Sequence, residues 1–244
     1  MLVNATDLKN NLGRYLRDAA REEIIILSNG RRIARLSAYV EPVSQPSAGL
    51  PLGEEAVAYS CYPRKATYAE YLEISANSEE RYEYIDGAIY LMDSPVTIHQ
   101  TALGELHFVF ASWFRNKSCR PMLAPYDITL KRCAADINVV QPDLMVICDL
   151  NEHLSDRGYY MGVPSLVVEI LSESTRGKDS VKKLDLYLST GIREYWLVNP
   201  FNREVTIFQF EKNDVAASKN YRLGDTASSM IFEGLQVCVA ALFA

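Results

Sequence analysis

Two carboxylates stand in stretches that otherwise have the composition of buried β-strands, Asp143 in VQPDLMVI and Glu169 in SLVVEIL. Burying a carboxylate without a partner is unfavourable, so each of them needs a reason to be there. Carboxylates at the ends of neighbouring strands can share one hard cation, which removes that cost and creates a site for phosphate chemistry. We therefore expect Asp143 and Glu169 to meet at a metal site that takes Mg²⁺ or Mn²⁺.

Two further charged residues belong to the same candidate set. Glu83 occurs in RYEYIDG, and Lys183 occurs in KDSVKKLDLY. Asp179, Lys183 and Tyr187 are spaced four residues apart and would share one face of a helix, whereas Lys182 would point elsewhere. A lysine beside a bound metal can orient the attacking water and add positive charge.

Each of these residues also has a purely structural interpretation. Asp143 follows a proline and could cap a turn, and Glu169 could pair with a buried lysine. Glu83 could alternate to the exposed side of a hairpin. Lys183 could form a surface ion pair with Asp179, which would contribute only a few tenths of a kcal/mol.

The three histidines carry less information than the acids. His99 begins an expected helix after a proline turn, and a structural hydrogen bond is at least as good an explanation for it as catalysis. We expect His107 and His153 to have no chemical role.

The elements that must position these residues have the pattern of an α/β or α+β domain, with helices flanking a mixed sheet. The Asp86-Gly87 pair predicts a hairpin turn. The predicted helices are TYAEYLEISA, TIHQTALGELHFVFASWF, residues 178–189 and residues 237–243, and the predicted strands are residues 122–130, 139–148 and 165–171, REYWLVNP, EVTIFQF and a segment near Met230.

Composition and charge set outer limits on function. The chain has 244 residues, of which 48% are hydrophobic and 23% charged, as in an ordinary soluble protein. Residues 1–40 hold seven Lys or Arg and four Asp or Glu, a net charge of +3, and the remainder holds 18 and 27, a net charge of −9. A basic head on an acidic body suggests that the head meets a polyanion.

The cysteines and apolar runs predict a cytoplasmic protein. The five cysteines form no CxxC pair, which predicts reduced, mostly buried thiols. The polar start MLVNATDLKNN predicts no signal peptide. The longest apolar runs, such as VCVAALFA, are too short to span a bilayer, so no membrane partner is expected.

The N-terminal part of the chain has the pattern of a separate small module. Residues 1–40 predict a strand, a helix after Thr6, and two strands joined at Asn29-Gly30. So small a unit has little core and is expected to need a partner copy. Residues 41–63 are rich in proline and glycine and predict a linker, which leaves residues 64–244 as the main domain.

Residues 64–244 resemble the Uma2 family, a group of nucleases with the PD-(D/E)xK restriction-endonuclease-like fold. The motifs occur in family order as YEYIDG, MDSPVTIH, QPDLMVI, VVEILSEST, RGKDSVKKLDLY and GIREYWLVNP. GIREYWLVNP and RYEYIDG are specific, whereas a PD dipeptide alone would mean little. The resemblance implies a mixed sheet flanked by helices, and DNA as the substrate.

The same resemblance implies roles for individual residues. Glu83, Asp143 and Glu169 would be the acids of a Mg²⁺ or Mn²⁺ site. The usual signature has a lysine two residues after the glutamate, where this chain has Leu171. In this family the lysine comes from the next helix, in the spacing D-x-x-x-K-x-x-x-Y, and Lys183 is the candidate.

The segment VNATDLKNNLGRYLRDAAREEIIILSNGRRIARL resembles the Phd/YefM antitoxin DNA-binding domain. That family dimerises and presents a helix start and basic side chains to operator DNA. The resemblance implies a homodimer. It also implies DNA contacts by Lys9, Asn10, Arg14, Arg31 and Arg32. The usual toxin-neutralising arm is replaced here by the linker and the nuclease-like domain, so a cognate toxin is in doubt.

The sequence as a whole predicts a metal-dependent DNA endonuclease with an antitoxin-like docking head. A second hypothesis is an antitoxin-type transcriptional regulator whose nuclease-like domain is catalytically inert. A third is an oligomerising or partner-binding protein in which the acids are structural.

Overall fold

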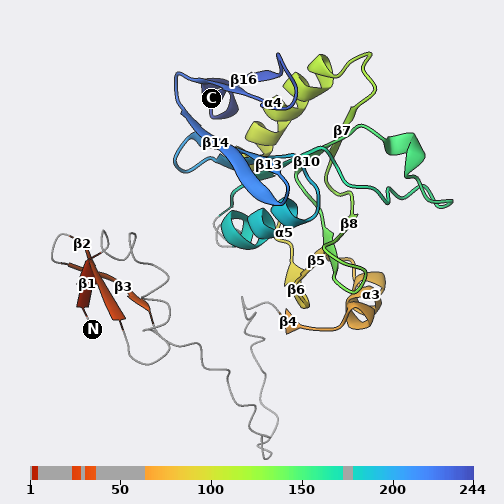
Figure 1. Cartoon of the computed structure of the whole chain (residues 1–244), viewed down its shortest axis with the longest axis horizontal. Coiled ribbons are helices and arrows are strands. Elements are labelled where there is room, and N and C mark those ends of the chain that lie inside the picture. The colour runs from red at the N-terminus through yellow and green to blue at the C-terminus, as the bar shows by residue number, and fades with distance from the viewer. Residues whose placement is uncertain (1, 5–23, 29–30, 37–63, 173–177) are drawn as a thin grey trace, which may run out of the picture. The chain divides into compact units, whose positions relative to one another are not determined.

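The structure is a computed structural model, and it describes residues 2–4, 24–28, 31–36, 64–172 and 178–244 (Figure 1). Backbone contacts divide the chain into two units, residues 1–59 and residues 60–244. No helix among the described residues is both long enough and apolar enough to cross a membrane.

The first unit contains a three-stranded sheet with the order β1-β2-β3. Strands β1 and β2 run parallel, and β2 and β3 run antiparallel. The bounds are β1 Leu2–Asn4, β2 Ile24–Ser28 and β3 Arg31–Leu36. These strands agree with the predicted pattern, whereas the helix expected after Thr6 and the Asn29-Gly30 turn lie outside the described residues.

The second unit is built around a six-stranded central sheet with the order β14-β13-β12-β11-β10-β7. Strands β11 and β12 are parallel, and the other neighbours are antiparallel. The bounds are β7 Arg120–Leu123, β10 Leu144–Ile147, β11 Leu166–Ile170, β12 Glu194–Asn199, β13 Glu204–Glu211 and β14 Asp214–Arg222.

A five-stranded sheet with the order β4-β6-β5-β9-β8 lies beside the central sheet, and β15 pairs with β16 separately. The predicted hairpin at Asp86-Gly87 is present as β5 and β6, and both turn residues have the positive φ that such a turn requires. The bounds are β4 Arg64–Lys65, β5 Tyr82–Ile85, β6 Ala88–Leu91, β8 Ile128–Lys131, β9 Ile137–Val140, β15 Thr226–Ser228 and β16 Gln236–Cys238.

The described helices lie close to the predicted positions. The helix α3 begins with a capping box, in which Thr67 accepts from the Glu70 backbone N–H and the Glu70 carboxylate accepts from the Thr67 backbone N–H. The predicted helix over residues 178–189 is a π-helical turn that continues into α5. The bounds are α3 Tyr68–Ala76, α4 Thr97–Trp113, a 3₁₀ turn Leu150–Glu152, the π-helical turn Lys178–Lys183, α5 Leu184–Ser189 and α6 Val239–Leu242.

The central sheet is buried on both faces, with α4 and α5 on opposite sides (Figure 1). On the α4 side, Phe110 meets Trp196 of β12 edge-to-face, with ring centroids 5.5 Å apart. On the α5 side, Tyr187 meets Tyr195 in the same way at 5.2 Å. Because both faces are covered, the central strands are nearly continuous in apolar residues, and a carboxylate among them is conspicuous.

Two predicted strands are each divided between the two sheets. Residues 122–130 contribute to β7 in the central sheet and β8 in the five-stranded sheet, and residues 139–148 contribute likewise to β9 and β10. The breaks fall at Pro125 and Pro142, which have no backbone N–H to donate to a ladder. The chain therefore crosses between the sheets just before Asp143, and this crossing positions the candidate site.

Near the C-terminus the strands differ in detail from the predicted ones. The strand expected near Met230 is β15, which ends two residues before it, because the backbone N–H groups of Met230 and Ile231 donate to the buried carboxylate of Glu194, at 2.6 and 3.0 Å, and not to a neighbouring strand. Strand β14 was not predicted, since its sequence DVAASKNYR carries little β-branched or aromatic character.

The expectation of reduced, mostly buried thiols is also wrong for the described residues. Cys119 and Cys148 form a disulfide, and Cys133 and Cys238 are exposed. The disulfide follows from register, because Arg120 of β7 pairs with Ile147 of β10 and the two cysteines are the next residues outward on these strands.

Candidate active site

Lys183 is the centre of a buried ion-pair cluster. Its ammonium group lies 2.8 Å from Glu83 Oε1 and 2.7 Å from Glu169 Oε1, and only 2% of its side chain is exposed. Removing an ammonium group from water is costly unless it is paired and hydrogen-bonded, and here two carboxylates supply the pairing. A surface ion pair is therefore the wrong interpretation of Lys183.

Glu169 comes from β11 and is held by two donors. Lys183 and the hydroxyl of Tyr187 both donate to Glu169 Oε1, the tyrosine at 2.5 Å. Burial, and then the negative charge of Glu169, raise the pKa of Tyr187 well above its ordinary value, so its hydroxyl stays protonated and remains a donor. The predicted Lys183–Tyr187 face is thus confirmed, and it points at Glu169.

Asp143 lies just before β10, where the antiparallel register of β10 and β11 places it opposite Glu169. Its Oδ2 atom accepts hydrogen bonds from the backbone N–H of Ile170, at 2.7 Å, and from His99 Nε2, at 3.2 Å. Within the described residues its other oxygen, Oδ1, accepts no hydrogen bond. Its side chain is 17% exposed, so one carboxylate oxygen is available to a ligand.

His99 lies in the first turn of α4 and is buried. Because the carboxylate oxygen Asp143 Oδ2 is an acceptor, the Nε2 atom of His99 carries a hydrogen and donates the hydrogen bond. The other ring nitrogen, Nδ1, is buried and has no hydrogen-bond partner among the described residues. The predicted structural hydrogen bond of His99 is therefore present, and its partner is a candidate site residue.

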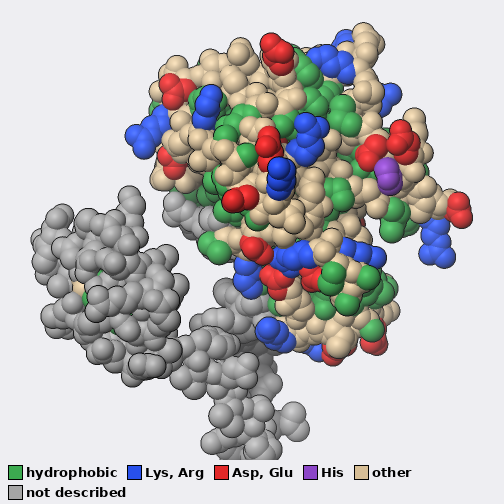
Figure 2. All heavy atoms as spheres, in the orientation of Figure 1, with side chains coloured by type: hydrophobic (Ala, Val, Ile, Leu, Met, Phe, Trp, Pro, Cys, Tyr) green, Lys and Arg blue, Asp and Glu red, His purple; other side chains and the backbone are tan. Residues whose placement is uncertain are grey.

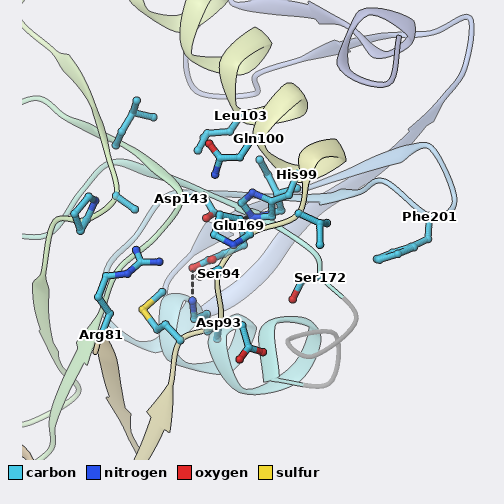
Figure 3. Close-up of a pocket in the computed structure, with 18 residues that line it drawn as sticks. Arg81, Asp93, Ser94, His99, Gln100, Leu103, Asp143, Glu169, Ser172 and Phe201 are labelled. Carbon is cyan, nitrogen blue, oxygen red and sulfur yellow. Dashed lines mark hydrogen bonds and ion pairs between the residues drawn. The ribbon is translucent and has the colours of Figure 1, made fainter. Parts of the chain in front are cut away.

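Asp143, Glu169, Lys183 and His99 all line one cavity of about 710 Å³ (Figure 3). Glu83 does not line this cavity, since its side chain is fully buried behind Lys183 and accepts a hydrogen bond from the backbone N–H of Gln141 at 3.0 Å. The predicted set of Glu83, Asp143, Glu169 and Lys183 is thus brought together. Three of these residues line the cavity, and Glu83 lies behind Lys183.

The other sequence candidates lie elsewhere or are not described. Lys182 points away from the cluster, as expected, and donates to the hydroxyl of Tyr90 at 2.6 Å. His107 and His153 do not line the cavity, and His153 pairs with Asp149 at 3.0 Å. The DNA-contact candidates Lys9, Asn10 and Arg14 lie outside the described residues, and of Arg31 and Arg32 only the backbone is described, in β3.

Arg81 is a charged cavity residue that was not identified from the sequence. Arg81 precedes β5 and lies two residues before Glu83, so strand alternation places both on the same face. The missed signal was therefore period-two spacing within RYEYIDG, next to an acid that had already been identified. The side chain of Arg81 extends along the wall of the cavity, on the side away from Phe201 (Figure 3).

The donor set suits a divalent cation in charge and in chemistry. Three carboxylates and one ammonium group leave two net negative charges in the cluster, and carboxylate oxygens are the ligands that Mg²⁺ and Mn²⁺ prefer. Among the described residues, however, no three acidic, histidine or cysteine side chains are arranged around one possible ion. Three carboxylate residues line the cavity, Asp93, Asp143 and Glu169, and of these Asp143 and Glu169 lie opposite each other on neighbouring strands, which makes them the candidate ligands.

The fold belongs to a known structural class. The chain is similar to a crystal structure from Anabaena variabilis described as "a putative nuclease belonging to DUF820", with a TM-score of 0.58 and 21% identity, over 72% of this chain and 96% of that one. At this level of identity the likeness establishes the fold, a mixed α+β arrangement of the kind that protein has.

The family is established by a direct match. The model of the Uma2 family, described as "Putative restriction endonuclease", matches residues 68–241, so the chain belongs to the Uma2 family. An uncharacterized protein of Synechocystis sp., slr1290, is 29% identical over 151 residues, which cover 62% of this chain and 76% of that protein. The resemblance to the Uma2 family is thereby confirmed over residues 68–241.

Proposed function

We propose that this chain is a metal-dependent endonuclease that hydrolyses DNA phosphodiester bonds at the cavity formed by Asp143, Glu169 and Lys183. The observation that carries the proposal is that two carboxylates from adjacent strands reach one cavity together with a buried, doubly paired lysine. The family description and the fold of the Anabaena protein support the same reaction class.

In this proposal Asp143 and Glu169 hold Mg²⁺ or Mn²⁺. A divalent cation supplies, when bound, a water of lowered pKa and a positive charge beside the phosphate oxygens. The ammonium group of Lys183 faces the same cavity and stabilises negative charge that develops on the phosphate. Glu83 and Tyr187 act indirectly, since Glu83 holds Lys183 in place and Tyr187 holds the carboxylate of Glu169.

The proposed role of the first unit rests on its sequence. Its resemblance to Phd/YefM antitoxins supports a homodimer that docks on DNA through Lys9, Asn10, Arg14, Arg31 and Arg32. Such docking would compensate for the acidic character of the rest of the chain, because phosphate contacts by Lys and Arg supply most non-specific DNA affinity.

Plasmid cleavage tests the proposal. Purified protein should nick supercoiled plasmid with Mg²⁺ or Mn²⁺, and both EDTA and Asp143→Asn should abolish the reaction. The asparagine retains the shape of Asp143 but removes its charge. Absence of cutting of supercoiled, linear and single-stranded DNA with either metal would reject the nuclease and favour the DNA-binding regulator.

Two substitutions of His99 should show whether cleavage depends on its hydrogen bond to Asp143 or on the imidazole ring itself. We expect His99→Leu to reduce cleavage by about 10- to 100-fold, the usual loss when a residue that orients a metal ligand is removed. His99→Gln should retain most of the activity, because its amide nitrogen can donate from nearly the position of Nε2. Equal cleavage by His99→Leu and the wild type would exclude a positioning role.

A further inference from the structure

The Arg81 guanidinium is a cation that faces the cavity and is left available there. Arg81 is half-buried and lines the cavity with Asp143 and Glu169. Among the described residues its side chain takes part in no hydrogen bond and no ion pair. Lys183, which also lines the cavity, differs in this respect, because its ammonium group is shared between Glu83 and Glu169.

A guanidinium in this position is suited to a phosphate. Its planar fork of N–H donors matches the oxygens of a phosphate and can bind two of them at once. Arg81 directly precedes β5, the strand whose Glu83 pairs with Lys183. A phosphate in this cavity could therefore be bound by a guanidinium that belongs to the same cavity as Asp143 and Glu169.

The cavity is too large and too apolar for a phosphate alone. Its volume of about 710 Å³ lies within the range of sites that enclose small organic molecules, roughly 300–1,000 Å³. Apolar side chains of Met92, Leu123, Pro125 and Phe201 contribute to its walls. Apolar and aromatic walls next to a phosphate anchor suit a nucleoside, since the flat faces of bases pack on such surfaces.

The charge pattern on the face of the second unit drawn in Figure 2 does not favour a duplex there. In Figure 2 the Lys and Arg side chains of the second unit are interspersed with Asp and Glu, and the described part of the face in view carries no continuous basic stripe. Duplex binding depends on many simultaneous phosphate contacts. A base within a duplex is also stacked and paired, and it would have to leave the helix to enter a cavity.

We propose that the cavity binds one unpaired nucleotide of a nucleic acid strand, with a phosphate on Arg81 and the base among the apolar side chains that line the cavity. The substrate class of the proposed nuclease would then be single-stranded or locally unpaired nucleic acid. The assignment of a substrate class rests on the proposed function, whereas binding of the nucleotide can be measured without cleavage.

The test is binding of a 5′-fluorescein-labelled pentathymidylate, followed by fluorescence anisotropy in Ca²⁺ and again in EDTA. A labelled hairpin duplex serves as the comparison probe. Because the first unit is expected to bind DNA as well, the decisive quantity is the difference between variants of the full chain. Arg157→Gln, which removes an exposed arginine that does not line the cavity, is the matched control.

We expect Arg81→Gln to weaken pentathymidylate binding by about 10- to 100-fold, the range for losing a hydrogen bond to a charged group. Arg81→Lys should give an intermediate loss, and Arg157→Gln should bind like the wild type. The affinity for the hairpin should change little in Arg81→Gln, because paired bases do not enter the cavity and any duplex held by the first unit does not depend on Arg81. Circular dichroism and thermal unfolding of each variant verify that it is folded.

Equal pentathymidylate affinity of folded Arg81→Gln and the wild type would overturn the proposal, as would an Arg81-dependent preference for the hairpin. The outcome is distinguishable from failure of the proposed function. Arg81-dependent binding without plasmid cleavage would reject the nuclease and retain the nucleotide site. Metal-dependent cleavage with no effect of Arg81→Gln on binding would retain the nuclease and reject the nucleotide site.

Discussion

Lys183→Met should lower the free energy of unfolding by about 3–5 kcal/mol, the usual cost of removing one partner from a buried ion pair. The substitution leaves Glu83 and Glu169 buried next to each other without the ammonium group that joins them. Methionine fills a similar volume, so the loss reports charge and not a cavity. Cleavage should be lost as well, since Lys183 is the cation closest to the proposed ligand Glu169.

Urea denaturation of Lys183→Met and of the triple variant Lys183→Met/Glu83→Gln/Glu169→Gln checks this expectation. Neutralising both carboxylates should recover most of the lost stability, because no unpaired charge then remains buried. Activity should stay absent in the triple variant. Unchanged stability of Lys183→Met would contradict the buried ion pair, and cleavage by the triple variant would contradict the site.

Glu169→Gln should retain the fold and reduce cleavage by more than about 100-fold, the upper end of the loss for residues that only orient metal ligands. The amide oxygen of glutamine can still accept from Tyr187, so the local hydrogen bonding persists. What is lost is the charge of one of the two proposed metal ligands.

The same plasmid assay measures this effect, with Glu211→Gln as the control. Glu211 is an exposed carboxylate at the end of β13 and does not line the cavity. Its variant should cut like the wild type, and both variants should unfold cooperatively. A Glu169→Gln protein that cuts at the wild-type rate would remove Glu169 from the metal site.

The main part of the site could be predicted because it depends on short-range patterns. A carboxylate in an apolar strand must have a partner, and Asp143 and Glu169 were found in this way. The four-residue spacing of Lys183 and Tyr187 correctly placed both on one face. These features depend on local chain geometry, which sequence spacing records directly.

The remainder depends on contacts between distant segments. Glu194 is also a buried carboxylate in a strand, but two of its partners are backbone N–H groups near residue 230, which no spacing rule reveals. The division of residues 139–148 between two sheets depends on which strands lie nearby. Glu83 is buried behind Lys183 and away from the cavity, where it accepts a hydrogen bond from the backbone N–H of Gln141 at the point of that division.

The position of Arg81 at the cavity also depends on distant segments and could not be predicted from the sequence. Its spacing to Glu83 was visible, but a single arginine at the start of a strand is most simply an exposed side chain. Its significance comes from the cavity that it shares with Asp143, whose strand lies in the other sheet.

The most direct test of the central claim is a Mn²⁺ titration of the full chain, monitored by the electron paramagnetic resonance signal of the free ion. The account predicts one Mn²⁺ bound per chain in the wild type and loss of that binding in Asp143→Asn/Glu169→Gln, with unchanged binding in Glu211→Gln. Mn²⁺ binding of equal stoichiometry and affinity in the wild type and the double variant would contradict a metal site at Asp143 and Glu169.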